Sequence, residues 1–391
     1  MNLGRSQKRN RKATVYLVVF VALAAALWYG RTRAAPNLTE PIGEIFPAAV
    51  TFEIDGGIFH IYDSDGIQLG WAASGGAIGY GGPMLLVTGI DTLGQIAGVR
   101  VVEQRETPVF WRMARGEDIL DSFTGARFDE AEYDKAGVDW ETGATISTDA
   151  IIASLRMSVA AVAGEAFDVR LPLPSRPFEF GIFEITILAL FVVGIVAQRS
   201  RSPKRRQVRW ACQVVALVVV GFWKHSPISL AKIASMMAGY FPDPSSGLAI
   251  YLLVLGFLLT SFLFGRNIYC QYVCPFNAAQ RLVGLIGGAS IKLPSWIVQT
   301  AERIRNLLVF AAIFLAFLTL KPALASYEPF AALFSLTGTT LQWLLLFIVL
   351  TLSLVVSTPF CNLFCPVRTI EKTIQDIRGL FRRPRKTETN A

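Results

Sequence analysis

Four of the five cysteines stand in two identical motifs. Cys270 and Cys274 form the first Cys-x-x-x-Cys-Pro motif and Cys361 and Cys365 form the second, so equivalent cysteines are 91 residues apart (270 to 361 and 274 to 365). Four converging thiolates can ligate an iron–sulfur cluster, either 4Fe–4S or 2Fe–2S. Zinc also accepts four cysteines and stays an alternative. The motifs therefore predict a metal site built by these four cysteines.

A heptapeptide ahead of a predicted helix offers a second kind of chemistry. Asp-Trp-Glu-Thr-Gly-Ala-Thr occupies residues 139–145. Apolar residues at helical spacing follow over 150–163, with Ser147 or Thr148 as the expected N-cap. The N–H groups and the dipole of a helix N-terminus favour a phosphate group. From these residues alone, the segment is either an anion site or an ordinary capped loop.

Hydropathy divides the chain into membrane helices and one water-facing segment. Of the 391 residues, 53% are hydrophobic and 17% are charged, whereas soluble domains carry roughly 25% charge. A membrane span needs about 20 mostly apolar residues, so a bundle of about six transmembrane helices is predicted. The six apolar runs lie at residues 13–30, 181–198, 210–222, 249–264, 307–320 and 341–356.

The basic residues lie on one side of this six-span alternation. The N-terminus, the loop after the second run, residues 266–305 and the C-terminal tail together hold 23 of the 37 Lys and Arg. Excess Lys and Arg marks the cytoplasmic side, so both termini are predicted to be cytoplasmic. Residues 31–180 then lie outside, with 11 basic and 22 acidic residues. The net charge of +8 thus describes membrane orientation and gives no indication of a nucleic-acid partner.

Four segments follow from this pattern. The sequence predicts a membrane anchor at 1–30, an exported domain at 31–180, a membrane domain with both cysteine motifs at 181–366 and a basic cytoplasmic tail at 367–391. A basic start, an apolar run and Arg-Ala-Ala before residue 36 are also compatible with a cleaved signal peptide. The length of the apolar run favours an uncleaved anchor.

The exported segment is predicted to be an α+β domain. A β-rich run at 84–90 and its return strand at 96–102 form a hairpin around Gly94. The preceding residues 75–82 are so rich in glycine that no regular element is expected there, although such backbone can approach a ligand closely. Glu-Thr-Pro follows the hairpin at 106–108 and is expected to form a loop.

The heptapeptide resembles the D-x-x-(S/T)-G-A-T signature of the FMN-binding domains in Rnf-type and sodium-pumping NADH:quinone reductase subunits and in NosR/NirI-like membrane flavoproteins. The glycine-rich segment, the hairpin and the Glu-Thr-Pro loop extend the resemblance over about 100 residues in the same order. The resemblance implies that a flavin transferase joins FMN to Thr145 through a phosphoester bond. It also implies cofactor contacts from Asp139, Thr142, Gly143, Ala144, Glu106 and Thr107.

The paired cysteine motifs again resemble the NosR/NirI-like family, and also the membrane subunits associated with reductive dehalogenases. NosR proteins continue into two ferredoxin-type clusters, whereas this sequence has 26 residues after Cys365, which is closer to the dehalogenase-associated type. The resemblance implies a multi-pass protein of the bacterial cytoplasmic membrane with its FMN domain outside.

The implied role is electron transfer between an inner-face iron–sulfur site, or the quinol pool, and the exported FMN. The expected recipient of the electrons is an exported reductase or its electron carrier. A redox-sensing membrane regulator or a maturation factor for a respiratory reductase is the alternative, and enzyme activity of the chain itself is left open. Because about 30 Å of hydrocarbon separates the two sites, an intermediate such as a quinone or a partner subunit is expected.

Overall fold

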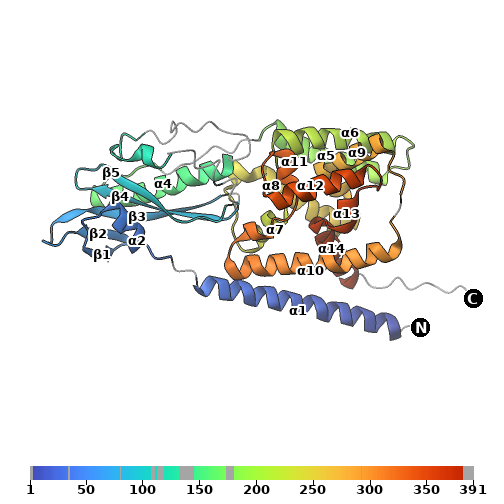
Figure 1. The fold of residues 1–391 in the computed structure, drawn as a ribbon, viewed down its shortest axis with the longest axis horizontal. Coiled ribbons are helices and arrows are strands. Elements are labelled where there is room, and N and C mark those ends of the chain that lie inside the picture. The colour runs from blue at the N-terminus through green and yellow to red at the C-terminus, as the bar shows by residue number, and fades with distance from the viewer. Residues whose placement is uncertain are drawn as a thin grey trace, which may run out of the picture.

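The computed structural model describes residues 3–33, 36–79, 81–106, 111, 119–131, 145–172, 180–291 and 293–381. Figure 1 shows two parts along the long axis of the molecule. A sheet with helices α2 and α4 forms one end and is called the sheet domain below. Helices α1 and α5 to α14 form the other end and are called the helical body.

The sheet is an antiparallel meander of five strands, in which each strand pairs with the next one in the sequence. The predicted hairpin is confirmed as β4 and β5, and Thr88 pairs with Val99. Gly94 makes their turn with a φ of +81°, a conformation that other residues adopt only with strain. The strands are β1 (Thr51–Asp55), β2 (Ile58–Tyr62), β3 (Gln68–Ile78), β4 (Pro83–Asp91) and β5 (Ile96–Glu103).

The expectation of irregular structure over 75–82 is wrong for its first half, because β3 continues to Ile78. The glycines of β3 allow a close approach of helix α4 (Thr145–Ala166), which covers this face of the sheet. A Cβ atom at Gly75 would lie 2.0 Å from the carbonyl oxygen of Ser154. Glycine therefore permits a helix-to-strand approach that any side chain would prevent, and the composition alone could not show this.

Two hydrophobic clusters occupy opposite faces of the sheet. Leu86 packs in the cluster beneath α4, and its neighbour Val87 packs in the cluster beneath α2 (Thr39–Ile45). This alternation follows from the period of two in a β-strand. The sheet is thus covered by one helix on each face, and the predicted α+β domain is confirmed.

The helical body has a helix at each of the six predicted apolar runs. Several of its helices continue as π-helical or 3-10 turns, labelled η. Its elements are α1 (Leu3–Arg33), α5 (Ile182–Arg199), α6 (Arg205–Ala216), η2 (Leu217–Trp223), α7 (Leu230–Met237), α8 (Pro244–Leu259), η3 (Thr260–Phe264), η4 (Tyr269–Val273), α9 (Pro275–Gly287), α10 (Ser295–Thr319), η5 (Pro322–Ala325), α11 (Phe330–Phe334), α12 (Thr340–Ser353), α13 (Pro359–Leu363) and α14 (Pro366–Phe381).

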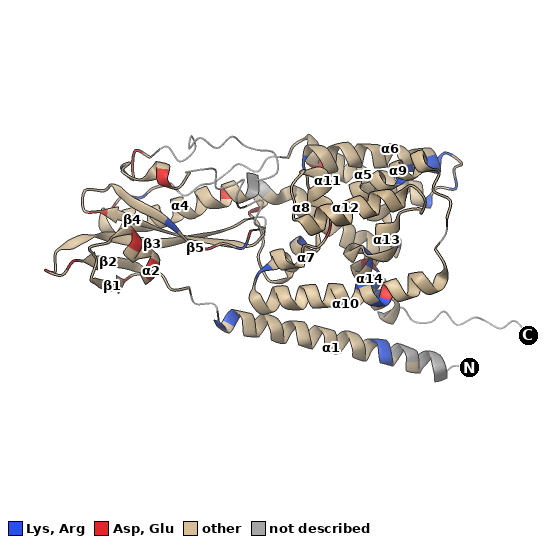
Figure 2. Cartoon of the chain, viewed as in Figure 1, with Lys and Arg blue, Asp and Glu red and all other residues tan. Residues whose placement is uncertain are grey.

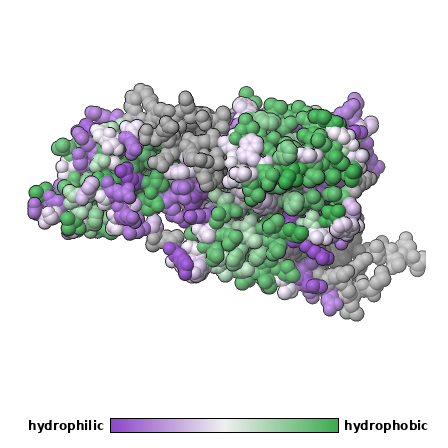
Figure 3. All heavy atoms as spheres, in the orientation of Figure 1, coloured by the Kyte–Doolittle hydropathy of each residue, from purple (hydrophilic) through white to green (hydrophobic). Residues whose placement is uncertain are grey.

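Among the described residues, three helices are long and apolar enough to cross a membrane: Asn10–Arg33, Ile182–Arg199 and Gly247–Phe264. Thr340–Ser353 is apolar but shorter, so the six-span arrangement stays a prediction. Figure 3 shows a largely hydrophobic exterior over the helical body. Large apolar side chains are exposed there, such as Phe347 at 70%. A surface of this kind suits lipid better than water.

Charge is distributed unequally between the two ends of the molecule. Figure 2 shows basic residues on the helical body around α6, α9 and α14, and acidic residues on the sheet domain. The first helix, α1, packs along α10. It also reaches α14, where Lys12 Nζ and Tyr16 Oη donate to the two carboxylate oxygens of Asp376 at 2.9 Å and 2.8 Å.

Candidate functional site

Each cysteine motif leads into a helix that begins at its proline. Pro275 and Pro366 are the first residues of α9 and α14, so Cys274 and Cys365 stand immediately before a helix. Proline is favoured at this position because the first N–H groups of a helix have no intrahelical acceptor. Cys270 lies in η4, and its equivalent 91 residues later lies in α13. The two motifs thus occupy matching structural positions.

The 91-residue spacing of the motifs relates α8, η3, η4 and α9, the first repeat, to α12, α13 and α14, the second repeat. Helix α9 contacts α12, and α14 contacts η3, so the two repeats pack against each other. Cys270, Cys274 and Cys365 share one hydrophobic core, while Cys361 is partly exposed. The assignment of all four cysteines to one metal site stays a prediction.

Burial and proximity disfavour free thiolates at this site. Desolvation raises the pKa of Cys274, Cys361 and Cys365 to about 12, and in each case a neighbouring cysteine of the set raises it further. Burial raises the pKa of Cys270 well above its ordinary value, with added contributions from the other three cysteines. Ligation requires the thiolate form. A bound cationic centre would supply the opposite charge that these four groups lack.

Within the described part of the chain, no three His, Cys, Asp or Glu side chains are arranged to hold a single metal ion. Zinc and an iron–sulfur cluster both accept four cysteine ligands. The donor set, four cysteines from two repeats, has the chemistry that such a cluster requires.

Two amide side chains on α9 face the second motif. Gln280 Nε2 and Asn277 Nδ2 donate to Cys361 Sγ at 3.2 Å and 3.5 Å. Gln280 is fully buried, and its Oε1 accepts a bond of 2.9 Å from the Phe360 N–H. Neither residue was predicted from the sequence. Their signal was a polar pair on a helix that directly follows a cysteine motif.

Two arginines add positive charge beside the second motif. Arg368 donates to the carbonyl oxygen of Cys361 at 3.2 Å. Arg305 is 2% exposed and donates to the Asn362 carbonyl oxygen and to Thr369 Oγ1. Buried arginines of this kind hold the loop in place and favour negative charge on nearby sulfur.

Of the flavin signature, Thr145 is the one residue that the structure describes, and it lies in α4. Ser147 and Thr148 lie within the same helix, so the N-cap prediction was wrong. Asp139, Thr142, Gly143, Ala144 and Thr107, which the resemblance implicates in cofactor binding, lie outside the described residues.

Glu106 packs against the segment that contains Gly79, Gly81 and Gly82, which is called the glycine turn below. Its carboxylate is 5% exposed, and Oε2 accepts a bond of 2.9 Å from the Gly81 N–H. A Cβ atom at Gly79 would lie 2.1 Å from Glu106 Oε1 and 3.5 Å from the Cβ of Ala150 in α4. The glycines therefore bring Glu106 beside the first turns of the helix that carries Thr145.

The start of α4 has features that suit the phosphate end of FMN. Ser147 is 1% exposed, and its Oγ has no hydrogen-bond partner among the described residues. A buried hydroxyl without a partner is costly, so a ligand oxygen is a natural complement. Together with the helix N-terminus and the glycine turn, it shows that the residues present fit the cofactor that the signature implies.

Arg105 joins this end of the sheet domain to the helical body. Its Nη1 donates to Tyr240 Oη at 2.8 Å and to the carbonyl oxygen of Leu320 at 2.5 Å, while its Nε donates to Glu103 Oε1 at 2.8 Å. Leu320 ends α10. The glycine turn beside Glu106 therefore lies against the helical body, a placement that the sequence alone did not predict.

Two known families match the chain over the regions that contain the two candidate sites. Residues 79–160 match the FMN-binding domain family, and residues 246–294 and 339–384 match the 4Fe-4S binding domain family. The two matched parts of the second family are the two repeats, each with one cysteine motif. The first match runs from the glycine turn into α4.

Two of the relatives are Protein NirI of Paracoccus denitrificans and Regulatory protein NosR of Pseudomonas aeruginosa. NirI is 26% identical over 194 residues, which cover 46% of this chain and 28% of NirI. NosR is 24% identical over 209 residues, which cover 49% of this chain and 29% of NosR. The chain is similar to these two proteins and also carries regions that match an FMN-binding and a 4Fe-4S binding family.

A third relative matches a shorter part of the chain. This relative is a component of the ion-translocating oxidoreductase complex of Vibrio vulnificus, and it is 36% identical over 90 residues, which cover 21% of this chain and 43% of the component. The alignments therefore span less than half the length of each of these three relatives. They relate this chain to its relatives through its cofactor domains.

Proposed function

We propose that the chain is a membrane electron-transfer flavoprotein, with a covalent FMN at Thr145 and an iron–sulfur cluster at Cys270, Cys274, Cys361 and Cys365. The observation that carries this proposal is the presence of an FMN-binding domain and a two-part 4Fe-4S binding domain in one chain. The contact through Arg105 supports it, because it holds the glycine turn against the helical body.

FMN exchanges one or two electrons, so it can join single-electron carriers to two-electron reactions. The residues of this chain would supply attachment and placement. Thr145 offers the hydroxyl at the start of α4, while Glu106 fixes the glycine turn beside it. A covalent tether prevents loss of FMN from a domain outside the cytoplasm, where no pool of free cofactor can replace it.

The proposed location is the bacterial cytoplasmic membrane, with both termini inside and the sheet domain outside. Separation of basic and acidic residues along the molecule supports this orientation. The proposed route runs from the cluster, or from the quinol pool, to FMN and then to an exported reductase or its electron carrier. A quinone or a partner subunit would bridge the hydrocarbon layer of about 30 Å, and a flavin transferase would attach FMN.

In-gel ultraviolet fluorescence of the denatured protein tests the flavin site. The wild type should fluoresce, Thr145→Ala should not, and Thr145→Ser should retain fluorescence because a hydroxyl is preserved. Thr148→Ala is the matched control in the same helix and should fluoresce like the wild type. Fluorescence in Thr145→Ala would place the attachment elsewhere.

Iron, sulfide and zinc analysis of anaerobically purified protein tests the metal site. Iron with equimolar sulfide is expected, and Cys270→Ser or Cys365→Ser should lose it. Cys212→Ser is the control, because Cys212 is a buried thiol in α6 outside the two motifs. Zinc without iron would contradict the cluster and favour the zinc alternative.

A redox-sensing regulator or a maturation factor is the second candidate, and the similarity to Regulatory protein NosR favours the regulator. A strain with Thr145→Ala distinguishes the roles. Loss of electron supply to a correctly expressed and matured reductase supports electron transfer. Loss of reductase transcripts supports regulation, and accumulation of immature reductase supports the maturation role.

A further inference from the structure

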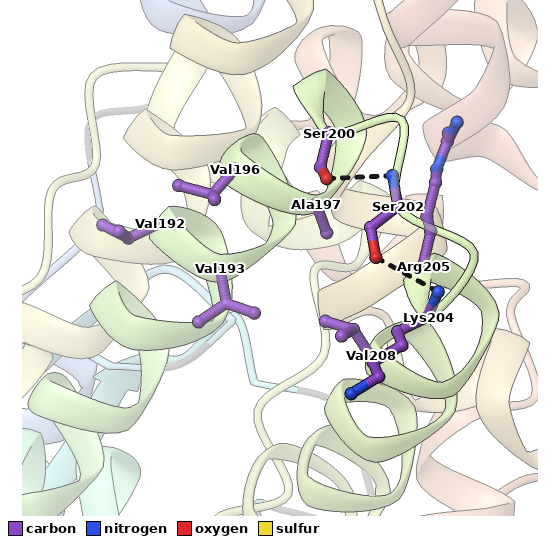
Figure 4. A pocket seen from close by; sticks show the side chains of 9 residues that line it. All are labelled: Val192, Val193, Val196, Ala197, Ser200, Ser202, Lys204, Arg205 and Val208. Carbon is purple, nitrogen blue, oxygen red and sulfur yellow. Dashed lines mark hydrogen bonds between the residues drawn. The ribbon is translucent and has the colours of Figure 1, made fainter.

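A hollow of about 300 Å³ opens between α5 and α6 on the side of the helical body (Figure 4). Its wall is aliphatic, with Val192 and Val196 from α5 and Val208 from α6. Its mouth is basic, because Lys204 and Arg205 lie where α6 begins. One cavity thus combines a surface for an alkyl chain with charges for an anion.

The positive charge at this mouth has no acidic counterpart nearby in the sequence. Residues 199–209 hold six Lys and Arg and no Asp or Glu. Arg205 Nη2 donates to Gln198 Oε1, while its buried Nε has no hydrogen-bond partner among the described residues. The N-terminus of α6 adds the positive end of its dipole. Val192 and Val196 are 57% and 62% exposed, so an alkyl chain could reach them from the surrounding lipid.

We propose that this hollow binds an anionic phospholipid, with its phosphate at Lys204 and its acyl chain along the valines of α5. Basic pockets between membrane helices are suited to anionic headgroups. An uncharged quinone would leave the basic mouth unused, and inorganic phosphate would leave the aliphatic wall unused. The complementarity therefore favours a molecule that carries both groups.

Native mass spectrometry of the full-length protein in detergent, with added phosphatidylglycerol or phosphatidylcholine, tests this site. The wild type should retain phosphatidylglycerol at least tenfold better. K204Q/R205Q should lose that preference, and R201Q/R206Q, the control on the same loop, should keep it. Val196→Trp, which fills the aliphatic wall, should weaken retention of both lipids. Equal loss in both charge variants, no preference in the wild type, or competition by inorganic phosphate or ubiquinone would overturn the proposal.

A different observation concerns the cysteine site and rests on the proposed iron–sulfur cluster. The 91-residue repeat relates Gln280 of α9 to Glu371 of α14. Gln280 donates to Cys361 Sγ in the opposite motif. Glu371 is 4% exposed, and its Oε1 accepts a bond of 2.8 Å from Gln375 Nε2. The equivalent positions of the two repeats therefore carry an amide in one and a carboxyl group in the other.

We infer that Gln280 is a positioning residue that raises the reduction potential of the group bound by Cys361. Hydrogen bonds to ligand sulfur stabilise the more negative, reduced state and so raise the potential. The amide of Gln280 is held for this role by its second bond, from the Phe360 N–H.

The midpoint potential of the cluster, measured by redox titration with electron paramagnetic resonance, tests this inference. Gln280→Glu keeps an acceptor for the Phe360 N–H but replaces the amide donor by a carboxylate. We expect the reduced-to-oxidised ratio at fixed potential to fall at least tenfold, which is about 59 mV for one electron. Gln342→Glu, at the start of α12, is the control.

Iron content separates the two ways in which the inference can fail. Wild-type protein without iron would overturn the proposed cluster itself. Iron-loaded Gln280→Glu with an unchanged potential would overturn only the role of Gln280. A shift of the same size in Gln342→Glu would show a general charge effect and would likewise contradict this role.

Discussion

Adjacent glycines in β3 give a matched test of how α4 is seated. A Cβ atom at Gly75 would lie 2.0 Å from the Ser154 carbonyl oxygen and 2.6 Å from the Ser158 nitrogen, both backbone atoms of α4. At Gly76 the nearest atom is the side-chain Cδ1 of Leu85 at 3.4 Å, which is ordinary contact. Gly75→Ala should therefore disturb the helix, whereas Gly76→Ala should not.

The cost of Gly75→Ala can be worked from these distances. Relief of the clash requires α4 to withdraw by about 1.4 Å, the difference between 2.0 Å and 3.4 Å. Overpacking of this kind costs about 1–3 kcal/mol. The hydroxyls of Thr88 and Ser158, 2.6 Å apart and buried, would separate and add about 1 kcal/mol. We expect a loss of roughly 2–4 kcal/mol in Gly75→Ala.

Chemical unfolding of the purified protein, followed through the flavin fluorescence of the sheet domain, measures this difference. Gly76→Ala should lie within about 1 kcal/mol of the wild type. Because Thr145 starts α4, Gly75→Ala should also lower the yield of covalent flavin. Equal free energies of unfolding for the two variants would refute the proposed seating of the helix.

Two further predictions address the domain contact and the pH response. Arg105→Gln removes the bonds to Tyr240 and Leu320 and should speed hydrogen exchange at the end of α10. The control Arg100→Gln changes an exposed arginine and should leave this exchange unchanged. Equal exchange rates in the two variants would contradict the contact through Arg105. Burial raises the pKa of Glu371 to about 7, so the folded state binds this proton more tightly than the unfolded state. The free energy of unfolding should therefore fall as pH rises from about 4.5 to 7 and level off above pH 7. Glu371→Gln should flatten this pH dependence in thermal unfolding. Parallel pH profiles for the wild type and the variant would contradict the role of Glu371.

Local patterns in the sequence predict the elements well where packing and periodicity agree. The hairpin around Gly94 and the helices at the six apolar runs are of this kind. They fail where a distant segment decides the outcome. Glycine is unfavourable within a strand, yet Gly75 lies in β3 because the close approach of α4 leaves no room for a side chain there. The N-cap prediction at Ser147 or Thr148 likewise missed a helix that begins at Thr145.

The candidate sites divide in the same way. Motif spacing predicted the four cysteines, because ligands from two repeats carry their own signature. Gln280 and Arg105 could not be found by spacing, because their partners Cys361 and Leu320 are 81 and 215 residues away. The polar pair on α9 is visible in the sequence, but the partners of these side chains depend on the fold and cannot be read from a local pattern.

The bonds from Lys12 and Tyr16 to Asp376 also set an order of events during synthesis. Lys12 precedes its acceptor by 364 residues. At roughly 5–20 residues per second, the first helix waits on the order of 20–70 s before α14 is made. Before that point α1 can already contact α10 and the end of α7, where Arg31 donates to the carbonyl oxygen of Ala238. The bonds to Asp376 are therefore formed later during synthesis than the contacts of α1 with α7 and α10.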